Sequence, residues 1–241
     1  DPNLNRARRA LDKVEFLVVQ DIFLTETAQF ADVVLPSLCF AEKDGTFTNT
    51  ERRVQRVRRA TAGPGQARGD IEIICALATA MGSPMHYPGG AAEVMAQIAS
   101  LSPSYGGISY PRLDGTGLQW PCPTPDHPGT PFLHKDKMTR GKGKFHPVDF
   151  REPAELPDEE YPFILTTGRL LYQYHTGTMT RKAAAINQVS PTGYVEINPR
   201  DAEDLGLGEG DAVQVSSRRG VLVAPTRITT MVPPGCLFIA F

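Results

Sequence analysis

The stretch FLVVQDIFLTETAQFADVVLP, residues 16–36, decides the fold class of the first part of this 241-residue chain. It opens with a continuous apolar run, Phe16 to Val19, of the kind that forms a buried parallel strand. A second run, Val33 to Leu35, ends at Pro36. Between them, Thr25 to Ala31 can form a short helix with Thr25 as its N-cap. Strand, crossover, strand predicts an α/β fold with a right-handed connection.

Helices are expected to follow these strands. Asp70 is placed to cap a helix that carries Ile71, Ile74, Ala78 and Met81 at helical spacing and closes at Gly82. A second helix is expected over residues 92–101. We therefore assign residues 1–101 to an α/β region that is the C-terminal part of a larger domain.

The middle of the chain, residues 102–157, is dominated by proline and glycine. So long a segment without secondary structure is unusual inside a compact domain. Its aromatic residues would anchor it on a larger body, as a free linker would not; they are Trp120, Phe132, Phe145 and Phe150. We predict an extended Pro/Gly-rich connecting arm.

The last part, residues 158–241, has a β pattern. Short strands are expected at residues 163–167, 194–197, 212–216, 221–224, 226–230 and 236–240. Asn198 to Gly206 between them reads as a compact helix, capped by Asn and closed by Gly. Six short strands with one small helix predict a closed six-stranded β-barrel.

Composition excludes several classes of protein. The chain is 41% hydrophobic and 22% charged with a formal net charge of −2, which fits a soluble globular protein and argues against a general nucleic-acid binder. No apolar run approaches the roughly 20 residues of a membrane helix, so no direct membrane insertion is expected. The chain starts without a signal-peptide pattern or Met and stops on an apolar strand, as a piece of a longer protein would.

The four cysteines do not predict a metal centre. Cys39, Cys75, Cys122 and Cys236 lie far apart without a C-x-x-C pair, whereas zinc and iron–sulfur sites usually show close paired spacing. The five histidines have no metal-ligand spacing either. Each cysteine is expected to pack as a small hydrophobic residue.

Polar residues follow the first strand. Gln20 and Asp21 come directly after Val19, at the carboxyl end where ligands bind open α/β sheets. The carboxylate there can accept two hydrogen bonds from a guanine edge or a ribose, or it can cap the turn into the next helix. After the second strand a long loop ends in five arginines between Arg52 and Arg59, which form either a solvated basic face or one that meets phosphates or an acidic partner.

The stretch TTGRLLYQYHTGTMTRK, residues 166–182, is more polar still. Gly168 and Gly177 would let backbone approach a ligand closely. Its threonines offer donors, its two arginines can bind phosphate, and its tyrosines and histidine can stack or donate. Together they favour a large, anionic, heteroaromatic ligand over a plain surface loop. The P-loop pattern is absent and no catalytic triad can be named.

Three stretches carry a family resemblance. Residues 18–55 resemble the segment that closes the second nucleotide-binding α/β domain of molybdopterin-dependent oxidoreductases. Residues 166–182 and 193–220 resemble their C-terminal molybdopterin-dinucleotide-binding barrel, which is of double-psi type. Within this superfamily, the sequence most resembles catalytic subunits of formate dehydrogenases, and QWPCP at residues 119–123 supports the same resemblance.

The resemblance implies a bis-molybdopterin guanine dinucleotide with molybdenum or tungsten, held while formate is oxidised to CO2 and electrons pass to an iron–sulfur cluster. The metal ligands and the [4Fe–4S] cysteines lie upstream in the family, so no catalytic or metal-ligating residue is expected in this chain. The implied cofactor-binding residues are Gln20, Asp21, Thr25, Glu42, Gly45, Thr46, Thr167, Gly168, Arg169, Gln173, Tyr174, His175, Thr176 and Thr178.

Two alternatives remain at this point. One is another molybdopterin oxidoreductase, such as a nitrate reductase. The other is a non-catalytic scaffold like the large iron–sulfur subunit of NADH dehydrogenase. The expected partners are the rest of the catalytic subunit and iron–sulfur or flavin electron-transfer subunits, with no nucleic acid. The expected compartment is the cytoplasm, or the periplasm if an export signal lies upstream.

Overall fold

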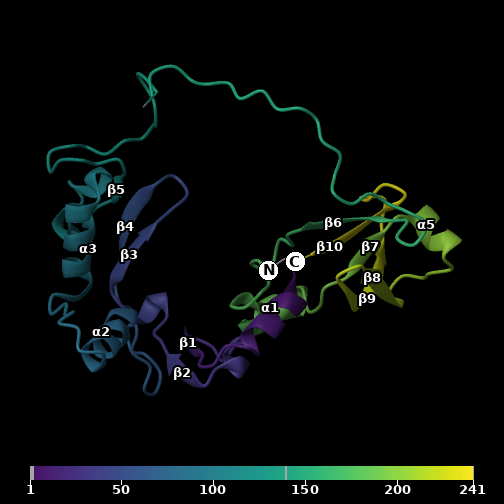
Figure 1. Cartoon of the computed structure of the whole chain (residues 1–241), viewed down its shortest axis with the longest axis horizontal. Coiled ribbons are helices and arrows are strands. Elements are labelled where there is room, and N and C mark those ends of the chain that lie inside the picture. The colour runs from purple at the N-terminus through teal and green to yellow at the C-terminus, as the bar shows by residue number, and fades with distance from the viewer. Residues whose placement is uncertain (1–2, 139, 241) are drawn as a thin grey trace. The chain divides into compact units, whose positions relative to one another are not determined.

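The computed structural model describes residues 3–138 and 140–240. Contacts divide the chain into two units, each described by itself. One contains Val14–His146, and the other contains the chain up to Lys13 together with the chain from Pro147 onward. Figure 1 labels their helices and strands.

The first unit contains the predicted strand, crossover and strand. β1 (Val18–Asp21) and β2 (Val33–Pro36) pair in parallel, from Val18 opposite Val33 to Asp21 opposite Pro36. The crossover holds a single 3-10 turn, Ala28–Phe30. The Thr25 hydroxyl accepts a hydrogen bond from the Ala28 N–H at 3.2 Å. Thr25 therefore binds the first N–H of this turn, but the N-cap is Thr27, and the turn is shorter than the helix predicted.

A second sheet of the same unit is antiparallel. β4 (Arg53–Val57) lies between β3 (Gly45–Thr48) and the short β5 (Leu118–Gln119). The helices of this unit are α2 (Asp70–Ala80) and α3 (Gly90–Leu101), with 3-10 turns at Phe40–Glu42, Pro103–Tyr105 and Tyr110–Leu113. The buried core residues are Val54, Met95, Ile108, Leu113 and Cys122.

The α2 prediction was right in extent and wrong in detail. Gly69 is the N-cap and Asp70 is the first helical residue. The Asp70 carboxylate binds the side chains of Gln20 and Lys43, which come from other segments. Ile73 is the buried residue of α2, whereas Ile74 and Met81 are exposed. The helix therefore turns a different stripe inward from the one predicted.

The first part of the predicted arm belongs to this core. Ile108, Leu113 and Cys122 are buried, and Trp120 packs against them. Residues 103–122 are therefore folded structure, not an extended segment. From residue 124 to residue 157 the described chain has no helix or strand. Phe132, Phe145 and Phe150 are exposed there, so of the predicted aromatic anchors only Trp120 packs into a core.

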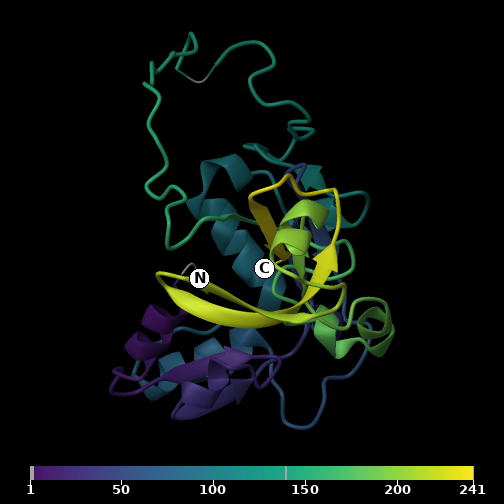
Figure 2. The same cartoon turned by 90° about the vertical axis from the view of Figure 1, so that its right-hand side faces the viewer.

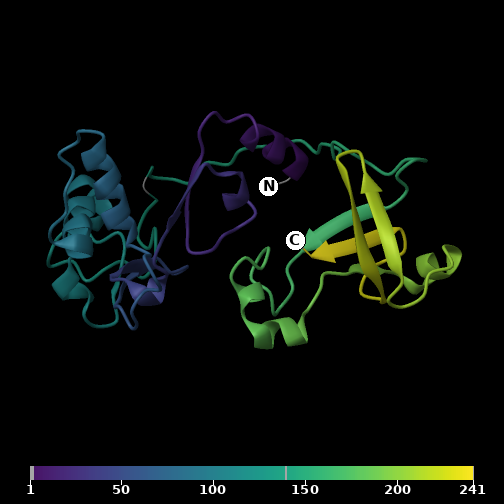
Figure 3. The same cartoon turned by 90° about the horizontal axis from the view of Figure 1, so that it is seen from below.

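The second unit is built on one mixed sheet with the strand order β6-β10-β7-β9-β8. β6 and β10 run in parallel (Figure 3), and β10 and β7 are antiparallel. The strand bounds are β6 Ile164–Gly168, β7 Val195–Ile197, β8 Ala212–Ser217, β9 Gly220–Ile228 and β10 Cys236–Ala240. The helices are α1 Leu4–Leu11, α4 Ala184–Val189 and α5 Pro199–Asp204, with a 3-10 turn at Thr180–Lys182. The buried core residues are Val195, Ile197, Ala202 and Leu237.

The prediction of six strands was wrong in number, because the two runs on either side of Pro225 form one strand. β9 pairs antiparallel with β8 as far as Pro225, and from Thr226 onward it pairs in parallel with β7. Proline has no N–H to donate, so it is tolerated at the residue where one ladder ends and the next begins. The pairings of the described strands leave β6 and β8 as edges, and they do not form a closed barrel.

The short helix predicted between Asn198 and Gly206 is present as α5. The Asn198 side chain accepts a hydrogen bond from the Arg200 N–H at 3.1 Å, and Pro199 occupies the first turn. Gly206 has a φ of 65° just after the helix. All four cysteines are free thiols, and Cys122 is fully buried.

Arg52 fastens the β3–β4 hairpin to the segment that follows β5. Its φ is 66°, a left-handed backbone conformation that residues other than glycine rarely adopt. Its guanidinium donates to the carbonyl oxygens of Trp120, of Thr130 at 3.0 Å and of Pro131 at 3.1 Å. It also lies over the Trp120 ring, 5.7 Å from the centroid. The strained backbone is offset by these contacts.

We predict that Arg52→Ala and Arg52→Gly both lower the urea midpoint of this unit, and that Ala lowers it more. Both variants lose hydrogen bonds from a charged donor, worth about 1.5–3 kcal/mol. Glycine relieves left-handed strain of about 1–2 kcal/mol, and alanine does not. Trp120 is the single tryptophan and adjoins Arg52, so its fluorescence reports the transition directly. A glycine variant as stable as the wild type would contradict the role given to the guanidinium.

Candidate functional site

Three predicted elements meet at Asp70, the first residue of α2. One carboxylate oxygen accepts a hydrogen bond from the Gln20 amide at 2.6 Å, and the other pairs with the Lys43 ammonium. Gln20 comes from the end of β1, and Lys43 comes from the loop before β3. Burial raises the Asp70 pKa, but the Lys43 charge and the hydrogen bonds outweigh it, so the pKa lies below its ordinary value. Asp70 is therefore an anion held between an ammonium and an amide.

A cleft of about 260 Å³ lies beside this cluster. Its polar end is formed by Lys43, Asp70 and the start of β3. Its apolar wall comes from α3 and from Tyr110; the α3 residues are Ala91, Val94, Met95 and Ile98. A Cβ added at Gly45 would meet no atom within 4 Å, so the backbone there borders open space. This volume is at the small end for ligand pockets and suits one ring system.

Three other predicted residues of this unit satisfy the backbone near them. Asp21 accepts a hydrogen bond from the Phe23 N–H at 3.0 Å, which is the turn-capping alternative considered for it. Thr25 binds the first N–H of the crossover turn. Glu42 accepts a hydrogen bond from the Cys39 N–H at 2.9 Å. Of the predicted residues of this unit, Gly45 and Thr46 line the cleft, and Gln20 binds Asp70 beside it.

The five arginines from Arg52 to Arg59 bind other parts of the chain. Arg56 and Arg58 share the Asp114 carboxylate at 2.5 and 2.8 Å, and Arg53 pairs with Glu51 at 2.8 Å. Arg59 donates to the Thr61 carbonyl at 3.0 Å. The run is therefore neither a plain solvated face nor an open phosphate-binding face.

In the second unit, Gln173 organises the polar loop that follows β6. Gln173 is buried, and its amide group donates to the Ser190 carbonyl at 3.0 Å and to the Asn187 side chain at 3.5 Å. Its carbonyl oxygen accepts a hydrogen bond from the Thr180 hydroxyl at 2.7 Å. This side chain is used within the protein, so it shapes the loop from inside.

The loop's two glycines are required by the chain's own packing. A Cβ on Gly168 would lie 2.8 Å from the Phe238 ring. Gly177 has a φ of 75°, and a Cβ there would lie 2.8 Å from the Arg181 side chain. Both glycines therefore permit close internal contacts, which is a different reason from the ligand approach we predicted.

The remaining predicted residues of this unit lie on the surface. Thr167, Arg169, Tyr174, His175, Thr176 and Thr178 are exposed. Arg169 and His175 nevertheless make contacts within the chain. The Tyr174 and His175 rings meet edge to face at 4.7 Å, and His175 has a φ of 51°. The Gly177 N–H donates to the Tyr174 carbonyl at 3.0 Å, which closes a turn that presents these side chains outward.

Sequence reasoning missed Lys43, Asp70 and Asn187. Lys43 stands between Glu42 and Gly45 in a stretch already singled out, so its charge was the available signal. Asp70 was interpreted as a helix cap, and no local pattern reveals its pairing with residues 27 and 50 positions away. In the part of the chain that the structure describes, no three His, Cys, Asp or Glu side chains gather as metal ligands would. No helix among the described residues is long and apolar enough to span a membrane.

Comparison with protein families and relatives agrees with these two units. Residues 1–80 match the molybdopterin oxidoreductase family, and residues 163–241 match the molydopterin dinucleotide binding domain. The chain is 50% identical, over its whole length, to the F420-dependent formate dehydrogenase 2 subunit alpha of Methanococcus maripaludis and to an F420-dependent formate dehydrogenase subunit alpha of Methanocaldococcus jannaschii. It is 42% identical, over 96% of its length, to a putative formate dehydrogenase of Staphylococcus haemolyticus.

The chain belongs to the molybdopterin oxidoreductases, as a class defined by these two domains. Within that class its relatives are formate dehydrogenase alpha subunits, and it spans 36% of the length of the two archaeal ones. A solved acetylene hydratase from Pelobacter acetylenicus has the same fold, with a TM-score of 0.69 and 20% identity over 99% of this chain and 34% of that one.

We predict that Gln173→Ala loosens the loop without unfolding the sheet. The variant leaves the Ser190 carbonyl and the Thr180 hydroxyl without their partner, so amide hydrogen exchange over residues 173–190 should rise on the order of tenfold. Exchange in β7 and β9 should not change. Tyr174→Ala is the matched control, because Tyr174 is 71% exposed. Unchanged exchange over residues 173–190 in Gln173→Ala would show that other contacts keep the loop ordered.

Proposed function

We propose that this chain is the cofactor-holding part of a formate dehydrogenase catalytic subunit. The whole subunit would oxidise formate to CO2, releasing a proton and two electrons. A molybdenum or tungsten ion in a bis-molybdopterin guanine dinucleotide would take up the electrons. An iron–sulfur cluster held elsewhere in the subunit would pass them on. The residues of this chain would bind and orient that cofactor.

The observation that carries the proposal is the Asp70 cluster beside the cleft. Guanine presents two N–H donors on one edge and a carbonyl acceptor next to them. Asp70 binds Gln20 with one carboxylate oxygen and Lys43 with the other, and a carboxylate has about four lone-pair sites for hydrogen bonds. The Lys43 ammonium can donate to the guanine carbonyl. Adenine has the opposite pattern on this edge, so the same group would discriminate against it.

The cleft also suits the shape of a base. Its α3 wall is apolar, which favours stacking on a flat ring, and its polar groups gather at one end. The open space at Gly45 lets a ring lie against the backbone of β3. These features support Gln20, Gly45 and Thr46 as nucleotide-binding residues. Asp21, Thr25 and Glu42 would act indirectly, by holding the strand end and the loop before β3.

The polar loop would hold a second part of the cofactor. Tyr174, His175, Thr176 and Thr178 present stacking faces and hydroxyls outward from an ordered turn. Thr167, Gly168 and Arg169 precede them at the carboxyl end of β6. Gln173 would contribute by fixing the loop. The match of residues 163–241 to a dinucleotide-binding domain supports this assignment.

Several finer points belong to the same proposal. The C-terminal sheet would form a barrel of double-psi type within residues 158–241, following an α/β part at residues 1–101 and a connecting arm. The whole protein would work with iron–sulfur or flavin electron-transfer subunits, because the relatives are named as alpha subunits. The expected compartment is the cytoplasm. Nitrate reduction and a scaffold role are less well supported, since the named relatives are formate dehydrogenases.

We predict that the chain binds GDP more tightly than ADP and that Asp70→Asn removes most of the preference. Loss of one charge-assisted hydrogen bond should reduce the ratio of the two affinities about tenfold. Titration calorimetry with each nucleotide measures the ratio. Asp136→Asn is the matched control, because Asp136 is an exposed carboxylate of the same unit outside the cleft. Equal affinity for GDP and ADP in the wild type would refute the guanine assignment.

A further inference from the structure

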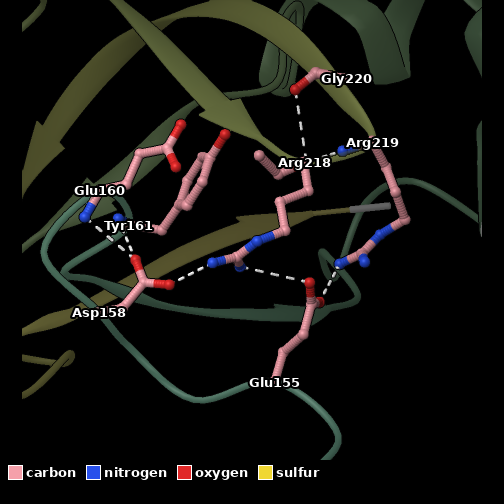
Figure 4. Close-up of polar contacts among 8 residues, drawn as sticks. Glu155, Asp158, Glu160, Tyr161, Arg218, Arg219 and Gly220 are labelled. Carbon is pink, nitrogen blue, oxygen red and sulfur yellow. Dashed lines mark hydrogen bonds and ion pairs between the residues drawn. The ribbon is translucent and has the colours of Figure 1, made fainter.

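An acidic segment just before β6 is fastened to the turn between β8 and β9. Arg218 binds the Asp158 carboxylate, and it also reaches Glu155 at 3.4 Å (Figure 4). Arg219 binds the other oxygen of Glu155 at 2.5 Å. The Arg218 guanidinium lies over the Tyr161 ring, 4.5 Å from its centroid. We call residues 155–161 the strap.

The strap has its own local order. The Asp158 carboxylate accepts hydrogen bonds from the Tyr161 N–H at 2.8 Å and from the Glu160 N–H at 3.1 Å. Asp158 thereby closes a turn and binds Arg218 with its other oxygen. The Tyr161 N–H holds the Asp158 pKa below its ordinary value, and Arg219 does the same for Glu155. Both carboxylates are therefore charged partners at neutral pH.

Strand registers show that the sheet must curl for this contact to exist. Leu165 of β6 is level with Leu237, Ile197 and Ile228 across the sheet, and β9 runs eight residues from Ile228 back to Gly220. In a flat sheet the β8–β9 turn would lie about 30 Å from the start of β6, from strand spacing and rise per residue.

Tyr161, whose ring lies under the Arg218 guanidinium, cannot reach that far. Three residues of chain from Ile164 to Tyr161 span at most about 10 Å, and the side chains of Tyr161 and Arg218 together add roughly 14 Å. The β8–β9 hairpin therefore folds over the rest of the sheet. Figure 2 shows it as a curved ribbon, and in the view of Figure 3 it crosses β6 and β10. Its inward residues Val213, Val215 and Ala224 pack on the core of β7 and β10.

We propose that Arg218, supported by Arg219, is a positioning residue for the polar loop that follows β6. The pair ties the folded-over hairpin to the strap, and the strap leads within three residues into β6. β6 ends at Gly168, where the polar loop begins. The Arg219 carbonyl also accepts a hydrogen bond from the Asn5 side chain at 3.1 Å, so α1 joins the same turn. The effect on cofactor rests on the proposed function, whereas the mechanical link does not.

The contact is more than a single surface ion pair. An exposed pair usually contributes little, because solvent and salt screen it. Here one guanidinium binds two carboxylates and one ring, and a second guanidinium shares one of those carboxylates. Charged networks of this kind hold a segment better than isolated pairs do, and they weaken when salt is added.

The test compares Arg218→Ala with Arg200→Ala in the 241-residue chain. Arg200 is an exposed arginine of the same unit, on α5, and it forms no ion pair among the described residues. Amide hydrogen exchange is measured over residues 155–168 and 169–180, at low salt and in about 1 M salt, where the Debye length falls to about 3 Å. Cleavage by a Glu-specific protease within the strap gives a second reading, because Glu155 lies in the contact.

We expect Arg218→Ala to raise exchange in the strap and in the loop on the order of tenfold at low salt, and to speed cleavage similarly. High salt should produce the same change in the wild type. Arg218→Lys, which keeps a positive charge opposite Asp158 and Glu155, should retain most of the protection at low salt and lose it at high salt, which a variant that is merely misfolded would not do. Arg200→Ala should behave as the wild type.

Faster exchange in the strap with an unchanged loop would overturn the positioning role. Unchanged exchange in both segments would overturn the contact itself. Neither reading uses a nucleotide, so they are independent of the GDP titration that tests the proposed function. In a full-length subunit with this sequence, Arg218→Ala should lower pterin content and Arg218→Lys should largely retain it. Full pterin content in Arg218→Ala would confine the role to the chain without cofactor.

Discussion

A polar group taken out of water must find a partner, and this constraint determines how the chain is held together. The buried clusters are small: five residues in one unit and four in the other. Long-range polar side chains supply what these cores do not. Asp70 joins β1, the loop before β3 and α2. Arg52 joins the β3–β4 hairpin to residues near Thr130. In each case one side chain contacts several distant segments, so its loss would leave several partly buried groups unpaired.

The same constraint explains how so polar a loop can be ordered. Gln173 satisfies both ends of its amide group within the loop, and Gly177 permits the tight packing of Arg181. The side chains left outside are those that suit a ligand. An ordered loop lowers the cost of binding, because fewer rotamers and backbone conformations are lost when the ligand arrives. Under the proposed function, internal order and ligand binding would be complementary roles of one stretch, divided between its inward and outward residues.

Local patterns predicted some of this structure and could not predict the rest. The apolar runs at Val18 and Val33 are sufficient to indicate the parallel pair β1 and β2. The expectation that these strands are buried was wrong, because Val18, Val33 and Val34 are exposed in this unit. Asn198, Pro199 and Gly206 likewise mark a helix by their own conformational preferences. The number of strands was predicted wrongly because Pro225 was taken as a break between two strands. Its missing N–H disrupts a strand only where a neighbouring strand needs that hydrogen bond.

The errors at the site have a related cause. The roles of Lys43 and Asp70 depend on a pairing across 27 residues, and no spacing rule reports a contact made by the tertiary fold. The arginines from Arg52 to Arg59 were predicted to form one basic face, either solvated or facing phosphates, although Arg52 binds backbone carbonyls, Arg53 binds Glu51, and Arg56 and Arg58 share Asp114. Charged residues in a run are alike in composition, but their function depends on the carboxylates and carbonyls that the fold brings near them.

In both units the polar residues lie at the carboxyl end of a strand that belongs to a parallel pair. In one, β1 runs parallel to β2 and delivers Gln20 and Asp21 at its carboxyl end. In the other, β6 runs parallel to β10 and delivers Gly168 and the polar loop at its carboxyl end. A parallel pair leaves the ends of its strands free of a tight hairpin, because the return connection must cross to the far end. The carboxyl end is thus available for side chains that bind a ligand, and a rigid strand fixes where they begin.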